Sequence, residues 1–300
     1  MSDTVVIGGA GWAGMALLRA LNAAHVDYCA ISHSDAGSDR LRRAGVTRLA
    51  RADLADPGSL GLVFRAARVV YAIPPALHPR EDEYLINAVQ AAEDAGVQRF
   101  IYHSVLHSGT PFLRNHQRKA RVEAALRASR FRWTILQPSM YAQVVAAMFN
   151  GKSDSTTKVP FDIDAEISVV DLADCAEVAV GTIVEPDIHD FATYELAGPL
   201  TTMRQAITEL GHIQGIDLRA TTVGVAHGSL PSAIADNPQA AADMISTFAH
   251  YDLHGFRGNT FVLTQLLGRA PRTFGEVIAR EYQPVAPQRH RSEHARTMGT

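Results

Sequence analysis

The sequence predicts an α/β protein built on a doubly wound parallel sheet, with a smaller domain following it. Short runs of β-branched and aromatic residues recur along the chain, and stretches with helical spacing of apolar residues separate them. The runs are continuously apolar rather than alternating, which is typical of strands covered on both faces. A glycine-rich turn also joins the first run to the first helical stretch. Alternation of this kind favours parallel strands joined by right-handed crossovers.

The elements can be assigned in order. Strands are expected at Val5–Ile7, Tyr28–Ile31, Val69–Ile73, Arg99–Val105, Trp133–Leu136 and Ile167–Val170. Helices are expected at Trp12–Ala24, Glu81–Ala95 and Arg118–Ser129. The second helix repeats apolar residues at three- and four-residue spacing and is followed by Gly96, a residue that favours helix termination.

The pattern loosens after about residue 150. We predict a large domain over 1–150, to which 165–185 returns, and a smaller mixed α/β domain over 186–283 on the substrate side. Residues 284–300 form a tail with little apolar patterning. Asp171 is the expected N-cap of a helix that continues to Val184.

The composition argues against several classes of protein. The 300 residues include 28 basic and 31 acidic side chains, a net charge of −3, without the basic excess typical of nucleic-acid binding. Cys29 and Cys175 form neither a disulfide framework nor a zinc-ligand spacing, and no metal site is predicted. The first residues lack a signal-peptide pattern, and no apolar run approaches the ~20 residues that span a bilayer. We expect a cytoplasmic protein that binds neither membrane nor nucleic acid.

The glycine-rich turn carries the sharpest functional signal. Gly8, Gly11 and Gly14 are spaced G-x-x-G-x-x-G between the first strand and first helix, with Trp12 and Ala13 at the helix start. A turn of this kind lets the backbone approach a diphosphate, and the helix offers free N–H groups and a positive dipole end. The sequence therefore predicts a Rossmann-type NAD(P)-binding domain, against the alternative of a purely structural turn.

The end of the second strand favours NADP(H) over NAD(H). An NAD site usually has an acidic residue at this place, but the strand is followed by Ser32 and His33, with Arg40 close behind. Hydroxyl, imidazole and guanidinium groups suit a 2′-phosphate. Asp35 is the one residue that argues for NAD(H), and Arg40 could instead belong to a solvated helix face.

Over nearly its whole length the chain resembles the NmrA-like branch of the atypical short-chain dehydrogenases. The resemblance lies in the glycine triplet and in residues 51–54, 72–75, 95–109, 115–123, 133–143, 194–201 and 266–274. It implies that Asp53 and Leu54 lie near adenine, and that Ile73 and Pro74 lie beside the nicotinamide-side ribose. His103 and Pro138 complete the expected cofactor-binding residues.

The same resemblance reveals a departure at the catalytic positions. The wider superfamily protonates a carbonyl with Ser, Tyr and Lys, the last two spaced Y-x-x-x-K. Lys119 holds the lysine place, but Asn115 stands four residues before it and Val105 holds the serine place. We expect Lys119 to bind the nicotinamide ribose, with an ordinary surface lysine as the alternative. His116 and Tyr141 are candidate proton donors, although pocket-lining roles suit both equally.

Loss of the usual acid limits the kinds of acceptor that the protein is expected to reduce. Acceptors that delocalise negative charge, such as quinones, enones, imines or dyes, need less help from a positioned acid. We predict an NADP(H)-dependent reductase of such a small molecule, held among His107, Gln137, Met140, Tyr141 and residues of the 250s. The alternatives are a non-catalytic NADP(H) redox sensor that reports to a protein partner, and an isomerase or cyclase that uses the cofactor as a scaffold. A homodimer is compatible with each.

Overall fold

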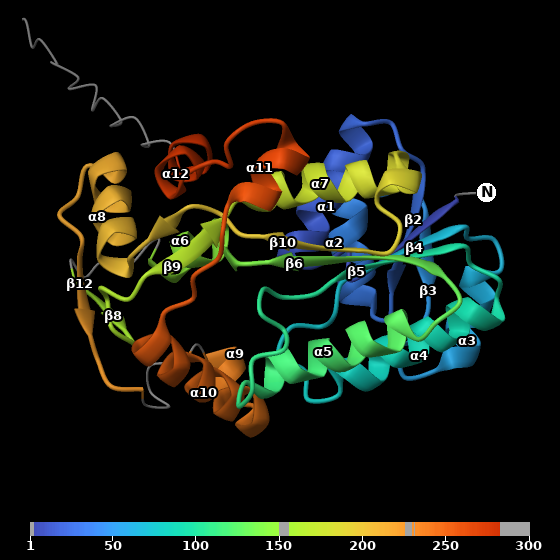
Figure 1. Cartoon of the computed structure of the whole chain (residues 1–300), viewed down its shortest axis with the longest axis horizontal. Coiled ribbons are helices and arrows are strands. Elements are labelled where there is room, and N and C mark those ends of the chain that lie inside the picture. Colours follow the sequence, from blue (N-terminus) through green and yellow to red (C-terminus); the bar gives the residue numbers. More distant parts are fainter. Residues whose placement is uncertain (1–2, 150–155, 226–229, 231, 283–300) are drawn as a thin grey trace, which may run out of the picture.

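The computed structural model describes residues 3–149, 156–225, 230 and 232–282 (Figure 1). In this part of the chain, the largest sheet has seven strands in the order β10-β6-β5-β4-β1-β2-β3, and every neighbouring pair is parallel. The strands are β1 (Thr4–Ile7), β2 (Tyr28–Ser32), β3 (Leu49–Arg51), β4 (Val69–Ala72), β5 (Arg99–His103), β6 (Arg132–Pro138) and β10 (Ala192–Leu196). The predicted parallel sheet is confirmed.

Helices cover both faces of this sheet, as the continuous apolar strands predicted (Figure 1). One face carries α1 (Trp12–Ala23), α2 (Asp35–Arg43), α7 (Leu172–Val184) and α11 (Phe261–Leu267). The other carries α3 (Pro57–Phe64), α4 (Glu81–Asp94) and α5 (Arg114–Arg127). Each layer buries its own apolar core, so the sheet is doubly wound.

A smaller group of elements lies beyond one end of the sheet (Figure 1). Its strands are β7 (Met140–Tyr141), β9 (Ile167–Val170) and β11 (Leu200–Thr201) in one sheet, and β8 (Thr156–Val159) and β12 (Arg219–Thr222) in another. Its helices are α6 (Ala142–Phe149), α8 (Met203–Gln214), α9 (Ser232–Ala235), α10 (Pro238–His254) and α12 (Phe274–Glu281). A short 3₁₀ turn, η1 (Pro186–Ile188), precedes β10. Within the described ranges, no helix combines the length and apolar character that a membrane span needs.

Two strands pair differently from the sequence expectation. Strand β9 lies between β7 and β11 in the small sheet, although α7 after it packs with α1 on the large one. Strand β10, which the sequence assigned to the smaller domain, pairs with β6 at the edge of the large sheet. Strand pairing depends on partners distant in the chain, so the local pattern could not place either strand. The domain boundaries themselves stay a prediction, and the tail over 284–300 lies outside the described residues.

Asp171 links the two parts of the fold. It is the N-cap of α7, as predicted, and its carboxylate accepts a hydrogen bond from the N–H of Ala173 at 3.0 Å. The same buried carboxylate binds the guanidinium of Arg280 at 2.7 and 2.9 Å, and the amide of Gln143 at 2.7 Å. Because these partners come from α12 and α6, one buried charge attaches α12 beside the glycine turn.

Candidate active site

The turn between β1 and α1 contains three glycines with different tasks. A Cβ at Gly8, whose φ is +76°, would lie 2.5 Å from the carbonyl oxygen of Ile73. A Cβ at Gly14 would lie 2.3 Å from the carbonyl oxygen of Gly8. At Gly11, a Cβ would find that same oxygen at 3.6 Å and no other described atom within 4 Å. The first and third glycines are therefore needed for packing, whereas the second keeps the backbone open to a ligand.

The amino end of α1 offers its backbone donors to that open side. Gly11 precedes the helix and provides no side-chain cap, and Trp12 at the first helical position is 56% exposed. The N–H groups of the first turn, including those of Trp12 and Ala13, have no acceptor within the helix. Together with the positive end of the helix dipole they attract an anion. The open backbone and the donors fit the diphosphate of a dinucleotide.

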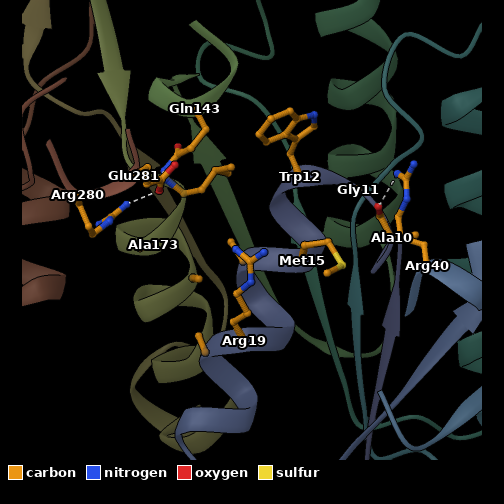
Figure 2. A pocket seen from close by; sticks show the side chains of 14 residues that line it. Ala10, Gly11, Trp12, Met15, Arg19, Arg40, Gln143, Ala173, Arg280 and Glu281 are labelled. Atoms are coloured by element: carbon orange, nitrogen blue, oxygen red, sulfur yellow. Dashed lines mark hydrogen bonds and ion pairs between the residues drawn. The ribbon is translucent and has the colours of Figure 1, made fainter. Parts of the chain in front are cut away.

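The turn opens onto a cavity of about 570 Å³ (Figure 2). One side is formed by the turn and α1, and the other by α6, α7 and α12. The residues along it include Ala10, Gly11, Trp12, Met15, Arg19, Arg40, Gln143, Ala173, Arg280 and Glu281. Gln143 fixes the second side because its amide also donates to Glu281, at 2.8 Å. Helix α12 thus borders the candidate cofactor site.

Positive groups border the end of β2. Ser32 is buried and its hydroxyl donates to a carbonyl of the next turn at 2.9 Å, while His33 is exposed. Arg40 extends from α2 and donates to a carbonyl oxygen of the glycine turn at 3.2 Å. Asp35 forms an ion pair with Arg51 at 2.5 Å. The carboxylate that argued for NAD(H) therefore has a cationic partner, which the sequence analysis did not identify.

The loops after β3 and β4 hold the residues assigned to adenine and to the nicotinamide-side ribose. The carboxylate of Asp53 accepts a backbone N–H two residues on, at 2.9 Å, and the carbonyl of Leu54 accepts from a side-chain amide of α4 at 3.0 Å. Ile73 and Pro74 are half-buried directly after β4, and Ile73 contacts the glycine turn through the approach to Gly8 described above. These four residues lie at the carboxyl edge of the sheet, and their contacts to a cofactor stay a prediction.

Lys119 takes part in a buried charge cluster. Its ammonium lies 2.9 and 3.0 Å from the two carboxylate oxygens of Glu81, which is 1% exposed. Arg118 contacts the same carboxylate at 3.3 Å and also pairs with Asp243 of α10. Lys119 is therefore not an ordinary surface lysine. Glu81 fixes the position of its ammonium, which keeps further N–H capacity for a ribose hydroxyl.

His103 lies between two tyrosines. Its Nδ1 is 2.8 Å from the Tyr71 hydroxyl and its Nε2 is 2.6 Å from the Tyr141 hydroxyl. Burial lowers the pKa of His103 to about 4, and the charge of Lys119 acts in the same direction. Burial also raises the pKa of Tyr141. The histidine is consequently neutral near pH 7, and Tyr141 keeps its proton.

The loop after β5 is held at the carbonyl oxygen of His107. The backbone N–H and the hydroxyl of Thr110 donate to it at 3.0 and 2.8 Å, and His116 Nδ1 lies 3.1 Å away. A carbonyl only accepts, so His116 carries its proton on Nδ1. Burial lowers the pKa of His116 to about 4. His107 itself has a φ of +56°, in the left-handed region that non-glycine residues rarely adopt.

A second cavity of about 240 Å³ lies beside His107. It is lined by His107, Thr110, Leu113, His250, His254, Gly255, Phe256 and Arg257. The expected meeting of His107 with residues of the 250s therefore occurs. Tyr141 and half-buried Met140 are not among its lining residues, and the buried carbonyl of Pro138 accepts from the N–H of Leu106 at 2.8 Å.

Gln137 does not reach this cavity, contrary to the sequence expectation. It is buried, and its amide donates to Glu123 at 2.8 Å and to Ser108 at 3.2 Å. Ser104 donates to the same Glu123 oxygen at 2.6 Å. Because these partners cover the amide, the polar end of Gln137 is used inside the fold.

The profile of the NmrA-like family matches residues 1–263, a span that includes the glycine turn, Lys119 and the cavity beside His107. This chain belongs to the NmrA-like family. Among curated proteins similar to it, an NAD(P)H azoreductase from Xenophilus azovorans is 23% identical over 91% of this chain and 95% of its own. Quinone oxidoreductase 2 from Escherichia coli K12 is 25% identical over 83% of this chain and 87% of its own.

Solved structures show that the fold is shared. A quinone oxidoreductase from Escherichia coli complexed with NADPH superposes with a TM-score of 0.75, 22% identity and coverage of 92% of this chain and 99% of that one. Triphenylmethane reductase from Citrobacter sp., complexed with NADP(H), superposes with a TM-score of 0.76 and 19% identity. The superposition covers 92% of this chain and 99% of that one. NmrA, a negative transcriptional regulator in complex with NAD, superposes with a TM-score of 0.74 and 16% identity. The superposition covers 94% of this chain and 95% of that one.

Asn115 stands where the wider superfamily has its catalytic Tyr, and in this structure it has a partner within the fold. Its side chain lies half-buried at the start of α5, where the hydroxyl of Thr247 approaches its amide oxygen at 3.5 Å. Val105 packs against the core of the smaller part of the fold. Neither side chain supplies a proton, so the positions that carry Tyr and Ser elsewhere in the superfamily contribute packing here.

Several residues of this site escaped the sequence analysis. Three charged residues cannot be told from ordinary surface residues in the sequence: Glu81, Arg51 and Glu123. In the structure each one bonds to a partner from another part of the chain. For Arg51 a signal was available, because the tip of the third strand lies beside the tip of the second in a doubly wound sheet. Glu81 and Glu123 gave no local signal.

Proposed function

We propose that this protein is an NAD(P)H-dependent reductase that transfers a hydride to an electron-poor small molecule of quinone, enone, imine or dye type. The observation that carries the proposal is the uncapped glycine turn, where Gly11 leaves the backbone open toward the donors of α1. The names of the NAD(P)H azoreductase and quinone oxidoreductase relatives support both the cofactor and the class of reaction.

The missing acid favours such acceptors. Bound NAD(P)H would supply the hydride, and a quinone that takes it up needs one further proton to become a hydroquinone. His103 and His116 are neutral and buried, and the hydroxyl of Tyr141 is engaged with His103. The chain's contribution is then to orient the two reactants, with Lys119 on the ribose and the acceptor beside His107. The proton is taken from solvent.

NADP(H) is the favoured form of the cofactor. The exposed side chains of His33, Arg40 and Arg51 surround the end of β2, where the adenosine ribose of a Rossmann-type site lies. Guanidinium groups bind phosphate in a bidentate manner, and the exposed ion pair with Asp35 leaves Arg51 able to exchange its partner. This grouping supports a 2′-phosphate on the ribose.

The test is turnover of a panel of quinones, enones, imines and cationic dyes, followed by the absorbance of the reduced nicotinamide. We expect oxidation of NADPH with at least one member of the panel, and weak or no oxidation with simple ketones. Turnover of simple ketones at comparable rates would contradict the proposal, because those acceptors need a positioned acid.

Gly11→Asp provides the decisive variant. Its side chain enters open space, so the fold tolerates it, while its carboxylate repels the diphosphate. We expect loss of both NADPH binding and turnover. Gly61→Asp is the matched control, since a Cβ there meets no described atom within 4 Å and the residue lies on α3, away from the glycine turn.

The likeness to NmrA favours a redox sensor as the second candidate, because that regulator was crystallised with NAD. A sensor would bind one redox form of the cofactor selectively, turn over no acceptor, and pass the signal to a protein partner. Calorimetric titration with NADPH and with NADP⁺ separates the two. Similar affinities together with turnover support the reductase. A homodimer and a cytoplasmic location stay predictions in both cases.

A further inference from the structure

The cavity beside His107 has an unusual set of ionisable side chains. His107, His250, His254 and Arg257 line it, and none of its lining residues is Asp or Glu. Within the described residues, the ion pair of Arg257 with Glu166, at 3.5 Å and with both side chains more than half exposed, is the only one that a lining side chain makes. Exposed pairs of this kind bind weakly, so the guanidinium can exchange its partner.

The imidazoles are close to one another. The rings of His250 and His254 have centroids 4.8 Å apart on successive turns of α10. Burial lowers the pKa of His250, and the nearby His254 and His107 lower it further. Three imidazoles and a guanidinium around one cavity therefore disfavour a second positive charge and favour a bound negative one.

One residue that lines the cavity, Phe256, belongs to a cluster of aromatic rings. Phe256 is buried, and its ring stacks on Tyr251 with centroids 5.0 Å apart. The rings of His107 and His116 meet Phe256 edge-on at 6.0 and 5.9 Å. The cavity thus combines an aromatic lining residue with the basic groups, which suits an aromatic ligand that carries a negative charge.

The cavity also adjoins the residues of the reductase site. His116 contacts His107 through its carbonyl oxygen, and the charge of Lys119, three residues further along α5, contributes to the lowered pKa of His116. The loop that carries His107 is thus bonded to α5, the helix that also carries the ammonium to which we assign the nicotinamide ribose.

We infer that this cavity selects aromatic acceptors that carry an anionic substituent, a carboxylate or a sulfonate, which His250, His254 and Arg257 bind. The inference rests on the proposed reductase function and adds the substrate class to it. The anionic group is held and not transformed: the hydride and the proton go to the conjugated system, and the substituent keeps its charge throughout.

The test uses redox-inert probes, so that it does not depend on turnover. Naphthalene-2-sulfonate and the neutral naphthalene-2-sulfonamide share one ring system and differ in charge. Calorimetric titration of the NADPH-bound protein is expected to show at least about tenfold tighter binding of the sulfonate, the size of one charge-assisted hydrogen bond. Equal affinities for the two probes would overturn the inference.

His254→Gln with Arg257→Gln is expected to remove this preference, and His212→Gln on α8 with Arg219→Gln on β12 is the matched control pair of exposed residues. Retained NADPH affinity shows that each variant is folded. If the double variant keeps the preference for the sulfonate, the assigned residues are wrong.

The two proposals fail in different ways. Selective binding of the sulfonate without turnover of any acceptor supports the cavity's preference and overturns the reductase function. Turnover of neutral and sulfonated naphthoquinones with the same KM, in the wild type and in the double variant, supports the reductase function and overturns the inference about the cavity.

Discussion

The imidazole Nε2 of His103 and the hydroxyl of Tyr141 form a hydrogen bond of 2.6 Å that joins the end of β5 to β7. Because Tyr71 occupies the other ring nitrogen, both polar atoms of a neutral histidine are satisfied inside the protein. A neutral imidazole has one N–H, so one tyrosine donates to His103 and the other accepts from it.

Tyr141→Phe leaves one nitrogen of His103 buried without a partner. We expect the free energy of unfolding to fall by about 1–3 kcal/mol, the usual cost of an unsatisfied buried group. Urea denaturation near neutral pH measures it. Tyr84→Phe, at a half-buried tyrosine that stacks on His78, is the control and should change little. Equal effects of both variants would contradict the role of the hydrogen bond.

The buried histidines make the fold sensitive to acid. The native pKa values of His103 and His116 lie at about 4, and an unfolded histidine binds a proton below about 6.5. As the pH falls, the unfolded state therefore takes up protons first. The free energy of unfolding should decrease between about pH 6.5 and 4, by about 1.4 kcal/mol per pH unit for each histidine.

Denaturation at a series of pH values checks this slope. His103→Gln removes one of the two titrating groups, so its stability should depend less steeply on pH than that of the wild type. An unchanged slope would show that other groups dominate the acid response.

Lys119→Met removes the ammonium but keeps Arg118 beside Glu81. We expect NADPH affinity to fall about tenfold, the value of one charged hydrogen bond. Stability should fall as well, because Glu81 loses a partner inside the protein. Calorimetric titration reports the affinity, and Lys158→Met on an exposed position of β8 is the control. An unchanged NADPH affinity would exclude the ribose role.

Arg40→Gln with Arg51→Gln tests the choice between the two nicotinamide cofactors. Loss of the guanidinium groups should weaken NADPH binding about tenfold or more and NADH binding far less, because NADH has no 2′-phosphate. The ratio of the two dissociation constants is the measurement. Arg65→Gln, at the exposed end of α3, is the control. Equal losses of affinity for NADPH and NADH would show that these arginines do not bind the 2′-phosphate.

Binding of an anionic probe beside His107 should depend on pH. Burial and the neighbouring imidazoles lower the pKa of His250, and a bound sulfonate favours its charged form, which lower pH populates. The ionisable groups that line the cavity are His107, His250, His254 and Arg257, with Glu166 on the arginine and buried His116 packed against Phe256. Affinity for naphthalene-2-sulfonate is expected to rise at lower pH, while that for the sulfonamide stays constant.

Much of the cofactor half of the site followed from the sequence. The glycine spacing, the strand before it and the helix after it are local features, and the structure confirms the turn that they predict. Lys119 was found by its place in a family pattern. Gln137 was misplaced because strand position alone does not say which buried carboxylate its amide will meet.

The doubly wound sheet and the glycine turn could be predicted from residues that are neighbours in the chain. They depend on apolar continuity along each strand and on the space that a missing Cβ leaves. The tertiary structure alone decided which sheet β9 and β10 join, that Asp35 meets Arg51, that Glu81 holds Lys119, and that His107 meets α10. These relationships join residues far apart in the chain. Their energies come from burial and charge pairing, which exist only once the elements have packed.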